Sequence, residues 1–451
     1  MSALVQISDL TVRKNETVIL DRISCDWQLG DFILLTGDSG SGKSTFIHTI
    51  AGFNGASFQG NVVMDGQRMS DYTIPEKAQK IGLMFQNPGQ QFTMRTLERE
   101  CFFALENCGL PYDQAKVRLN QAVDDLGIRH LLEQDLMTLS GGEKQRAALA
   151  ILIAVNPPVF FLDEPFASID PASRLFLINV LAKLRQQGKL IVVVDHELTD
   201  YKGLINRFFI MRDGQLSEAD VTTLPEKAPI PLLTSGQASS ESAFTLENIA
   251  IKQGDKTLLH QEKFIFQKGV STLTGDNGAG KSTLLKAMAQ LHPYKGKMRF
   301  QDRRLSRFWG KKSLYESLTL AVQDAAQQFV TLEVASELRF PNEDAGEIRD
   351  RQMQALEDLN ISHVLDRSLY HLSEGQKKMV QLIALLSLDH QFLMLDEPFA
   401  GLDLKASDYF ADWIEDKKRD TDFLIVSHRL GPLESVSDHH IHLSNQVLKE
   451  V

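Results

Sequence analysis

The stretch GDSGSGKST, Gly37 to Thr45, decides the fold of the first half of this chain, and GDNGAGKST, Gly275 to Thr283, repeats it in the second half. Both stretches fit the pattern G-x-x-x-x-G-K-[ST], in which backbone N–H groups surround the phosphates of a nucleotide and the lysine adds a positive charge. A chance glycine-rich turn could explain one isolated match. Two matches, each followed by the same further motifs in the same order, indicate two nucleotide-binding domains.

The two loops belong to a long internal repeat. Lys43 and Lys281 are 238 residues apart, and Asp163 and Asp396, which follow apolar runs further along, are 233 residues apart. A spacing that drifts so little indicates one whole domain present twice. The expected parts are a first domain (1–220), a Pro- and Ser-rich linker (221–242) and a second domain (243–451).

The composition is that of an ordinary globular protein. Of the 451 residues, 43% are hydrophobic and 24% are charged. The net charge of -11 argues against a nucleic-acid partner, which usually needs a basic surface. Cys25, Cys101 and Cys108 form no CxxC pair, so we expect reduced thiols. The N-terminus lacks an apolar signal core, and the most apolar stretch, 147–162, is too short to span a bilayer.

Short apolar runs alternate with helical patterns in both halves, which predicts an α/β fold with a mainly parallel sheet covered by helices. The chemically important residues follow the C-terminal ends of the predicted strands, where open α/β sheets bind their ligands. Residues 86–139 and 323–372 have more helical pattern and are expected to form an inserted helical subdomain in each half. The predicted strands lie at 32–35, 159–162, 190–194, 271–273, 392–395 and 423–426.

Two adjacent carboxylates end an apolar strand in each half. An aspartate at the positions of Asp163 and Asp396 can hold Mg²⁺, and the neighbouring Glu164 or Glu397 can orient and polarise an attacking water molecule. A single such pair could be an acidic cap on a strand. Its presence at equivalent positions after both phosphate loops favours the catalytic interpretation.

The strings LSGGEKQR, Leu139 to Arg146, and LSEGQKKM, Leu372 to Met379, carry a family resemblance. A serine and glycines at a helix N-terminus form an anion-binding site. The chain resembles the ATP-binding cassette (ABC) ATPases, whose signature is LSGGQ, over nearly its whole length. The resemblance implies two P-loop NTPase domains of ABC type in tandem, ATP hydrolysis with Mg²⁺, and an intramolecular dimer in which each signature closes over the nucleotide of the other half.

The resemblance also assigns roles residue by residue. Gln86 and Gln323 match the Q-loop glutamine, which links Mg²⁺ and water to a membrane partner. His196 and His428 match the switch histidine that contacts the γ-phosphate, and Asp170 and Asp403 match the D-loop. The expected catalytic residues are Glu164, Glu397, His196 and His428, and the expected metal ligands are Ser44, Gln86, Asp163, Ser282, Gln323 and Asp396. The expected ATP-binding residues are Gly37, Asp38, Ser39, Gly40, Ser41, Gly42, Lys43, Ser44, Thr45, Gln86, Ser140, Gly141, Gly142, Gly275, Asp276, Asn277, Gly278, Ala279, Gly280, Lys281, Ser282, Thr283, Gln323, Ser373 and Gly375.

A narrower resemblance lies around the first Q-loop. FQNPGQQFTMRTLERECFFALENCGL, Phe85 to Leu110, is similar to the ATPases of energy-coupling-factor importers, which take up vitamins and transition-metal ions. This implies an energy-coupling subunit, peripheral on the cytoplasmic face of the cell membrane, with a membrane scaffold and a substrate-binding membrane subunit as partners. The alternatives are an ABC exporter ATPase, a ribosome-associated tandem ABC protein, and a chromosome or DNA-repair ATPase. The short linker, and the lack of a heptad run or Cys/His cluster, disfavour the last two.

Three features depart from the family pattern. Glu374 replaces the first signature glycine, and Glu143 replaces the signature glutamine. Because an unpaired carboxylate near a γ-phosphate is unfavourable, we hypothesise unequal hydrolysis rates, with the site that pairs Lys43 with Ser373 slower. The family usually stacks an aromatic residue on adenine before the phosphate loop, but the aligned positions are Lys14 and Gln253.

Overall fold

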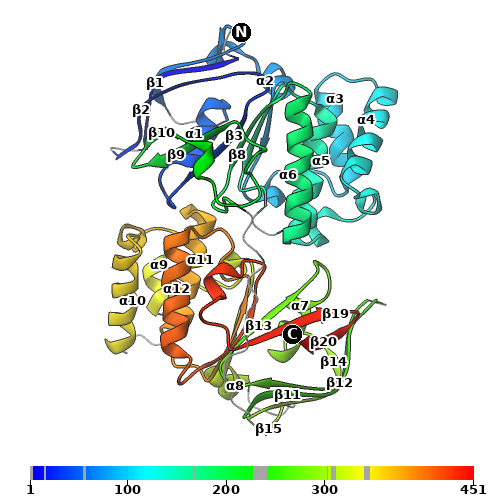
Figure 1. Cartoon of the computed structure of the whole chain (residues 1–451), viewed down its shortest axis with the longest axis vertical. Coiled ribbons are helices and arrows are strands. Elements are labelled where there is room, and N and C mark those ends of the chain that lie inside the picture. Colours follow the sequence, from blue (N-terminus) through cyan, green and yellow to red (C-terminus); the bar gives the residue numbers. More distant parts are fainter. Residues whose placement is uncertain are drawn as a thin grey trace. The chain divides into compact units, whose positions relative to one another are not determined.

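A computed structural model describes residues 4–14, 17–53, 57–166, 169–226, 241–254, 256–301, 303–305, 311–339 and 346–451. The chain divides into two compact units, Met1–Ala228 and Pro229–Val451, built on one plan (Figure 1). Within the expected linker, residues 227–240 lie outside the described part, as do residues 340–345 of the second helical insert.

A six-stranded sheet forms the centre of the first unit. Its strand order is β10-β9-β3-β8-β7-β6, and all neighbours are parallel except β9 and β10. Apart from Thr36 and Gly37 at the end of β3 and Asp163 at the end of β7, the strands β3, β7 and β8 consist of apolar residues, because both faces of the sheet are covered. The strands are β3 (Phe32–Gly37), β6 (Ile81–Met84), β7 (Val159–Asp163), β8 (Leu190–Val194), β9 (Arg207–Arg212) and β10 (Gln215–Ala219).

A second, antiparallel sheet packs against one face of this sheet, and the sequence analysis did not predict it. Its order is β2-β1-β4-β5. Trp27 from this sheet packs edge-on against Phe46, with ring centroids 5.8 Å apart, and beside Phe161 of the central sheet. The strands are β1 (Val5–Lys14), β2 (Thr17–Trp27), β4 (Phe58–Met64) and β5 (Gln67–Arg68), and the helices nearby are α1 (Lys43–Ile50) and α2 (Ile74–Lys80).

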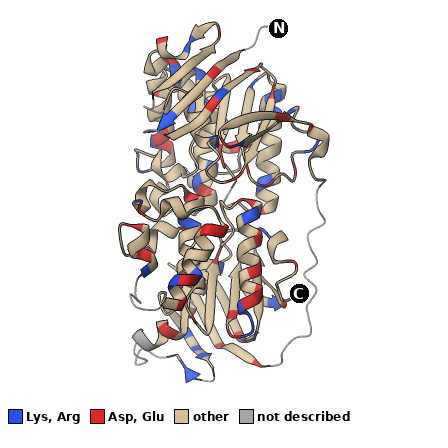
Figure 2. Cartoon of the chain, turned by 90° about the vertical axis from the view of Figure 1, so that its left-hand side faces the viewer, with Lys and Arg blue, Asp and Glu red and all other residues tan. Residues whose placement is uncertain are grey.

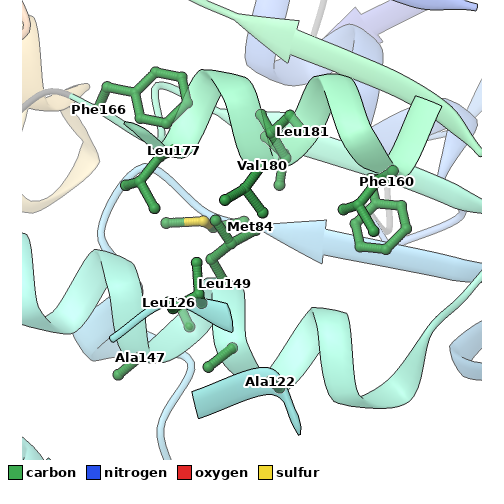
Figure 3. Packing of buried hydrophobic residues seen from close by; sticks show 14 of the residues in the cluster. Met84, Ala122, Leu126, Ala147, Leu149, Phe160, Phe166, Leu177, Val180 and Leu181 are labelled. Atoms are coloured by element: carbon green, nitrogen blue, oxygen red, sulfur yellow. The ribbon is translucent and has the colours of Figure 1, made fainter. Parts of the chain in front are cut away.

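Helices cover the other face, and the expected helical subdomain is present. Figure 3 shows Met84 at the end of β6 packed among Leu149, Leu177 and Val180, so the subdomain shares one core with the sheet. This continuous core holds the loop after β6 beside the start of α5. The helices are α3 (Leu97–Asn107), α4 (Tyr112–Asp125), α5 (Gly141–Val155) and α6 (Pro171–Gln186).

The second unit repeats this architecture. Its sheets have the orders β16-β17-β18-β13-β19-β20 and β12-β11-β14-β15. The strands are β11 (Ser242–Gln253), β12 (Lys256–Gln267), β13 (Val270–Gly275), β14 (Tyr294–Phe300), β15 (Arg303–Arg304), β16 (Leu318–Ala321), β17 (Phe392–Asp396), β18 (Asp422–Val426), β19 (His439–Ser444) and β20 (Val447–Glu450). The helices are α7 (Lys281–Met288), α8 (Lys311–Ser317), α9 (Val334–Arg339), α10 (Gly346–Asp358), α11 (Glu374–Leu386) and α12 (Leu404–Lys417).

The loops of both units contain short 3-10 helices. They are η1 (Met69–Asp71), η2 (Pro88–Gln90), η3 (Arg129–Leu131), η4 (Leu136–Thr138), η5 (Val221–Thr223), η6 (Ala325–Gln327), η7 (Ser362–Val364), η8 (Leu369–His371) and η9 (Gly431–Leu433).

Positively and negatively charged residues are interspersed along the elements visible in Figure 2. The three cysteines are free thiols, as expected. None of the helices in the described ranges combines the length and the apolar character that crossing a membrane requires.

Candidate functional site

The two phosphate loops have the same backbone geometry. Each runs from the end of a central strand, β3 or β13, into a short helix, α1 or α7. Gly37 has a φ of 151°, and a Cβ atom there would lie 2.1 Å from the Met211 carbonyl oxygen. Gly275 repeats this constraint, with its Cβ position 2.5 Å from the Leu443 carbonyl oxygen. The first glycine of each loop is therefore required by its close approach to the neighbouring strand.

The loop lysines point back into their own loops. Lys43 Nζ donates to the carbonyl oxygens of Gly37 and Asp38, each at 2.8 Å. Lys281 Nζ donates to the carbonyl oxygens of Gly275 at 2.6 Å and Asp276 at 3.0 Å. Both side chains are buried, so each lysine places its charge at the centre of the loop, where a phosphate would bind.

An aspartate with an unused oxygen lies beside each loop. Asp163 is 2% exposed and Asp396 is 4% exposed, and in each the Oδ1 atom has no hydrogen-bond partner among the described residues. Burial, and then the Glu164 charge, raises the pKa of Asp163 to about 7, while a hydrogen bond from Ser44 lowers it. Burial also raises the pKa of Asp396, against a hydrogen bond from Ser282. A buried carboxylate with an unpaired oxygen next to a hydroxyl is a donor set that suits Mg²⁺.

In the first unit, two predicted site residues contact the carboxylate of a third. Gln86 Nε2 donates to Glu164 Oε2 at 2.9 Å, and His196 Nε2 lies 3.1 Å from Glu164 Oε1. Glu164 and His196 are both buried. Glu164 follows β7, Gln86 follows β6 and His196 follows β8, so three neighbouring strand ends bring together residues far apart in sequence.

The second unit arranges the same residue types differently. Glu397 Oε2 accepts a hydrogen bond of 3.1 Å from the backbone N–H of His428. The His428 side chain turns to the phosphate loop, with Nε2 3.3 Å from Lys281 Nζ and 3.1 Å from Asn277 Oδ1. Burial, and then the Asp396 charge, raises the pKa of Glu397. His428 Nε2 also lies 3.6 Å from Glu397 Oε1. Both switch histidines therefore lie close to their glutamate, and that of the second unit also contacts the phosphate loop.

Both Q-loops are held by a second glutamine whose role the sequence analysis did not identify. Gln91 accepts from the Phe85 N–H at 2.9 Å and donates to the Leu83 carbonyl oxygen at 2.9 Å. Gln328 makes the same pair of bonds, to the N–H of Val322 and the carbonyl oxygen of Leu320. This glutamine occurs at the same position of both Q-loops, within FQNPGQQF in the first, and this repetition could have identified its role from the sequence.

A buried glutamate closes the other end of each loop. Glu100 in α3 accepts from the Thr93 N–H at 2.8 Å and from the Met94 N–H. Glu337 in α9 accepts from the Thr331 N–H and hydroxyl, both at 2.8 Å. These bonds tie each Q-loop to its helical subdomain.

The signature serines cap their helices. Ser140 precedes α5 and donates its hydroxyl to Glu143 Oε2 at 2.7 Å, while its N–H donates to the same oxygen at 2.8 Å. Ser373 precedes α11 and forms the equivalent capping box with Gln376. The carboxylate of Glu143 therefore holds the Ser140 hydroxyl.

Glu374, the other departure in a signature, is paired with a cation. Lys377 Nζ lies 2.8 Å from Glu374 Oε1. This ion pair partly neutralises the charge that the sequence analysis expected to slow one site. The prediction of unequal rates stays a prediction.

The D-loop aspartates are helix N-caps. Asp170 accepts from the Ser173 N–H at 2.9 Å at the start of α6, and Asp403 accepts from the Ala406 N–H at 2.8 Å at the start of α12. Lys14 and Gln253, the residues aligned with the adenine-stacking position, are exposed at the ends of β1 and β11.

An arginine ties each switch-histidine loop to its surroundings: the buried Arg174 in the first unit and the partly buried Arg429 in the second. Arg174 of α6 forms ion pairs of 3.0 Å with Asp195 and Asp200. In the second unit Arg429, next to His428, donates instead to the carbonyl oxygens of Phe399 at 2.6 Å and Leu402 at 2.8 Å. The loop is thus fixed in both units by unrelated contacts.

These features define the class of protein: a duplicated P-loop ATPase in which each unit has a phosphate loop, an acidic strand end, a Q-loop and a capped signature helix. The family model for ABC transporters matches residues 20–167 and 259–400. The chain belongs to this family, and it is an ATP-binding ABC ATPase with two such domains in tandem.

Two relatives align with this chain over most of their own length. The chain is 28% identical to YkoD of Bacillus subtilis (strain 168), a protein named for HMP/thiamine import ATP binding, over 96% of this chain and 88% of that protein. It is 29% identical to a Treponema denticola protein named as an ABC transporter ATP-binding protein, over 95% and 93% of the two chains. The solved structure of RNase-L Inhibitor shares the fold, with a TM-score of 0.62 at 20% identity over 96% of this chain and 87% of that one.

Proposed function

We propose that this ABC ATPase is the energy-coupling subunit of a membrane importer of the energy-coupling-factor type, with a vitamin, a vitamin precursor or a transition-metal ion as cargo. The observation that carries the proposal is the paired Q-loop structure. In both units a glutamine, Gln91 or Gln328, fixes the Q-loop backbone, and a buried glutamate, Glu100 or Glu337, ties the loop to the helical subdomain. Gln91 and Glu100 belong to the stretch, Phe85 to Leu110, that resembles the importer ATPases, and Gln328 and Glu337 are their counterparts in the second unit.

The similarity to a protein named for HMP/thiamine import also supports the importer proposal, because this similarity extends over 96% of this chain. The ribosome-associated alternative has support from fold alone, since an archaeal ribosome recycling factor, solved in complex with a ribosomal stalk protein, shares the fold with a TM-score of 0.63 at 20% identity. No feature of the described residues favours an exporter over an importer.

The proposed chemistry follows from the site. The backbone amides of residues 37–45 and 275–283 would hold the ATP phosphates, with Lys43 and Lys281 facing the β- and γ-phosphates. Mg²⁺, when bound, neutralises charge developing on the phosphates. Ser44 with Asp163, and Ser282 with Asp396, would hold it, because each aspartate has a buried oxygen without a partner among the described residues.

Hydrolysis would use the glutamate beside each aspartate. Glu164 and Glu397 would orient and polarise the attacking water molecule, and His196 and His428 would contact the γ-phosphate. The Q-loops would pass the state of each site to the membrane subunits, on the cytoplasmic face of the membrane.

The proposal is tested by purifying the tagged chain from detergent-solubilised native membranes and identifying its partners by mass spectrometry. We expect a polytopic scaffold and one or more small membrane subunits that bind a vitamin or a metal ion. Recovery of ribosomal proteins, or of no membrane protein, would overturn the transport assignment and leave the ATPase assignment intact.

A further inference from the structure

Several residues of the second signature helix differ in chemistry from their counterparts in the first, and one of them is a buried lysine. Lys378 of α11 is 4% exposed. The residue at the equivalent position of α5, five places after the signature serine, is Gln145. A buried lysine is costly unless its charge and its three N–H donors find partners.

Lys378 finds those partners in the Q-loop of its own unit. Its Nζ atom donates to the carbonyl oxygen of Gln323 at 2.9 Å and to that of Val322 at 3.4 Å. A third contact, of 3.1 Å, runs to Gln381 Oε1 on the same helix. One side chain thus joins the signature helix to the backbone of the Q-loop glutamine.

Gln381 strengthens this connection. Its Nε2 atom donates to the Val322 carbonyl oxygen at 3.0 Å and to Gln328 Oε1 at 2.7 Å. Gln328 is the residue that holds the Q-loop backbone. Lys378, Gln381 and Gln328 therefore form one hydrogen-bonded network, which we call the Lys378 network.

The first unit lacks the Lys378 network. The position of Gln381 is taken by Ala148, which has no hydrogen-bonding side chain. The Oε1 atom of the buried Gln145 has no partner among the described residues. Gln91 and Glu100 hold the Q-loop of the first unit. Among the described residues, no charged donor of its signature helix contributes a hydrogen bond to this loop.

The charge of Lys378 also acts on the acidic strand end. Its charge acts on both Asp396 and Glu397, which are buried carboxylates. In the first unit Gln145 supplies no charge to Asp163 and Glu164. The two units therefore differ in both Q-loop anchoring and charge compensation.

We propose that Lys378 is a positioning residue that fixes the Q-loop of the second unit to its signature helix, so that this Q-loop opens less readily than the Q-loop of the first unit. Lys378 acts through the backbone of Gln323, and its effect on hydrolysis rests on the assignment of Glu397 as the residue that orients water. The effect on loop opening depends on neither that assignment nor the transport proposal.

The first test is hydrogen exchange of the full ATP-free chain, read by mass spectrometry on peptides covering residues 84–92 and 320–330. Lys378→Met and Lys378→Gln should speed exchange in 320–330 by about tenfold, because charge-assisted hydrogen bonds to its backbone are lost. The peptide 84–92 in the same protein should not change. The matched control Gln145→Met should leave 84–92 unchanged as well.

The second test separates positioning from ATP binding. In a Glu164→Gln background, which leaves hydrolysis to Glu397, Lys378→Met should lower kcat by about fivefold or more and change KM for ATP by less than about twofold. Unchanged exchange in 320–330 would overturn the proposal, and so would an equal acceleration of 84–92 by Gln145→Met. Faster exchange throughout β11 to β14 as well would also overturn it, since it would show a general role of Lys378 in folding.

Discussion

The side-chain amide of Gln86 donates a hydrogen bond of 2.9 Å to Glu164, the glutamate expected to orient water in the first unit. Within the described residues Gln323 and Glu397 share no such bond, and Glu397 accepts instead from the backbone of His428 at 3.1 Å. Two copies of one module therefore hold the same carboxylate by different donors. Because Glu164 and Glu397 have different hydrogen-bond donors, we expect the two ATP sites to differ in hydrolysis rate.

Removing the two glutamates one at a time should give unequal losses of ATPase activity. Glu164→Gln and Glu397→Gln keep the side-chain shape and remove the carboxylate, and the double variant should lose about 100-fold or more. The sequence-based expectation is the smaller loss for Glu164→Gln. Phosphate release under saturating ATP measures the rates, with ATP binding as the control, and equal losses would contradict unequal sites.

Glu143→Gln should raise ATPase activity, up to about tenfold. The carboxylate of Glu143 accepts the Ser140 hydroxyl at 2.7 Å, which competes with any phosphate for that donor. A glutamine at this position still caps the helix, as Gln376 does in the second unit. Glu374→Gln is the matched control and should change activity less, because Glu374 is already paired with Lys377. A fall in activity of Glu143→Gln would contradict this account.

Arg174→Met should destabilise the first unit more than Arg429→Met destabilises the second. Loss of Arg174 leaves the charges of Asp195 and Asp200 without their ion-pair partner, at a cost of about 3–5 kcal/mol. Loss of Arg429 leaves two backbone carbonyl groups to find other donors, at about 1–3 kcal/mol. Urea unfolding followed by hydrogen exchange in each unit measures both values. The reverse order would show that the ion pairs around Arg174 contribute little.

Alkylation should modify Cys108 at least about tenfold faster than Cys101 in the folded protein. Burial, and then the charge of Glu100, raises the pKa of Cys101 to about 12, so its thiolate form is scarce at neutral pH and the sulfur is inaccessible. Cys108 is partly exposed, and its pKa is raised by burial to a smaller extent. Mass spectrometry after timed iodoacetamide treatment reports both rates, and treatment in urea should remove the difference. Equal rates in the folded protein would show that α3 opens readily.

The sequence alone determined the features that depend on short-range pattern. The phosphate loops, the buried parallel strands and the helices that follow the signature serines were predicted because each is encoded in a few consecutive residues. The antiparallel sheet of β1, β2, β4 and β5 was missed, because its pairing depends on register between separate segments. The duplication supported the assignment of the weaker motifs, because a short motif is less often a chance match when it occurs at equivalent positions in both halves.

Only the tertiary structure decided which donors meet each carboxylate. Glu164 meets Gln86 from 78 residues away and His196 from 32 residues away because neighbouring parallel strands end side by side. The same packing brings Lys378 of a helix to the backbone of Gln323, 55 residues earlier. The sequence motifs identify these residues. Their hydrogen-bond partners depend on side-chain direction and burial, which follow from how the helices and strands pack in three dimensions.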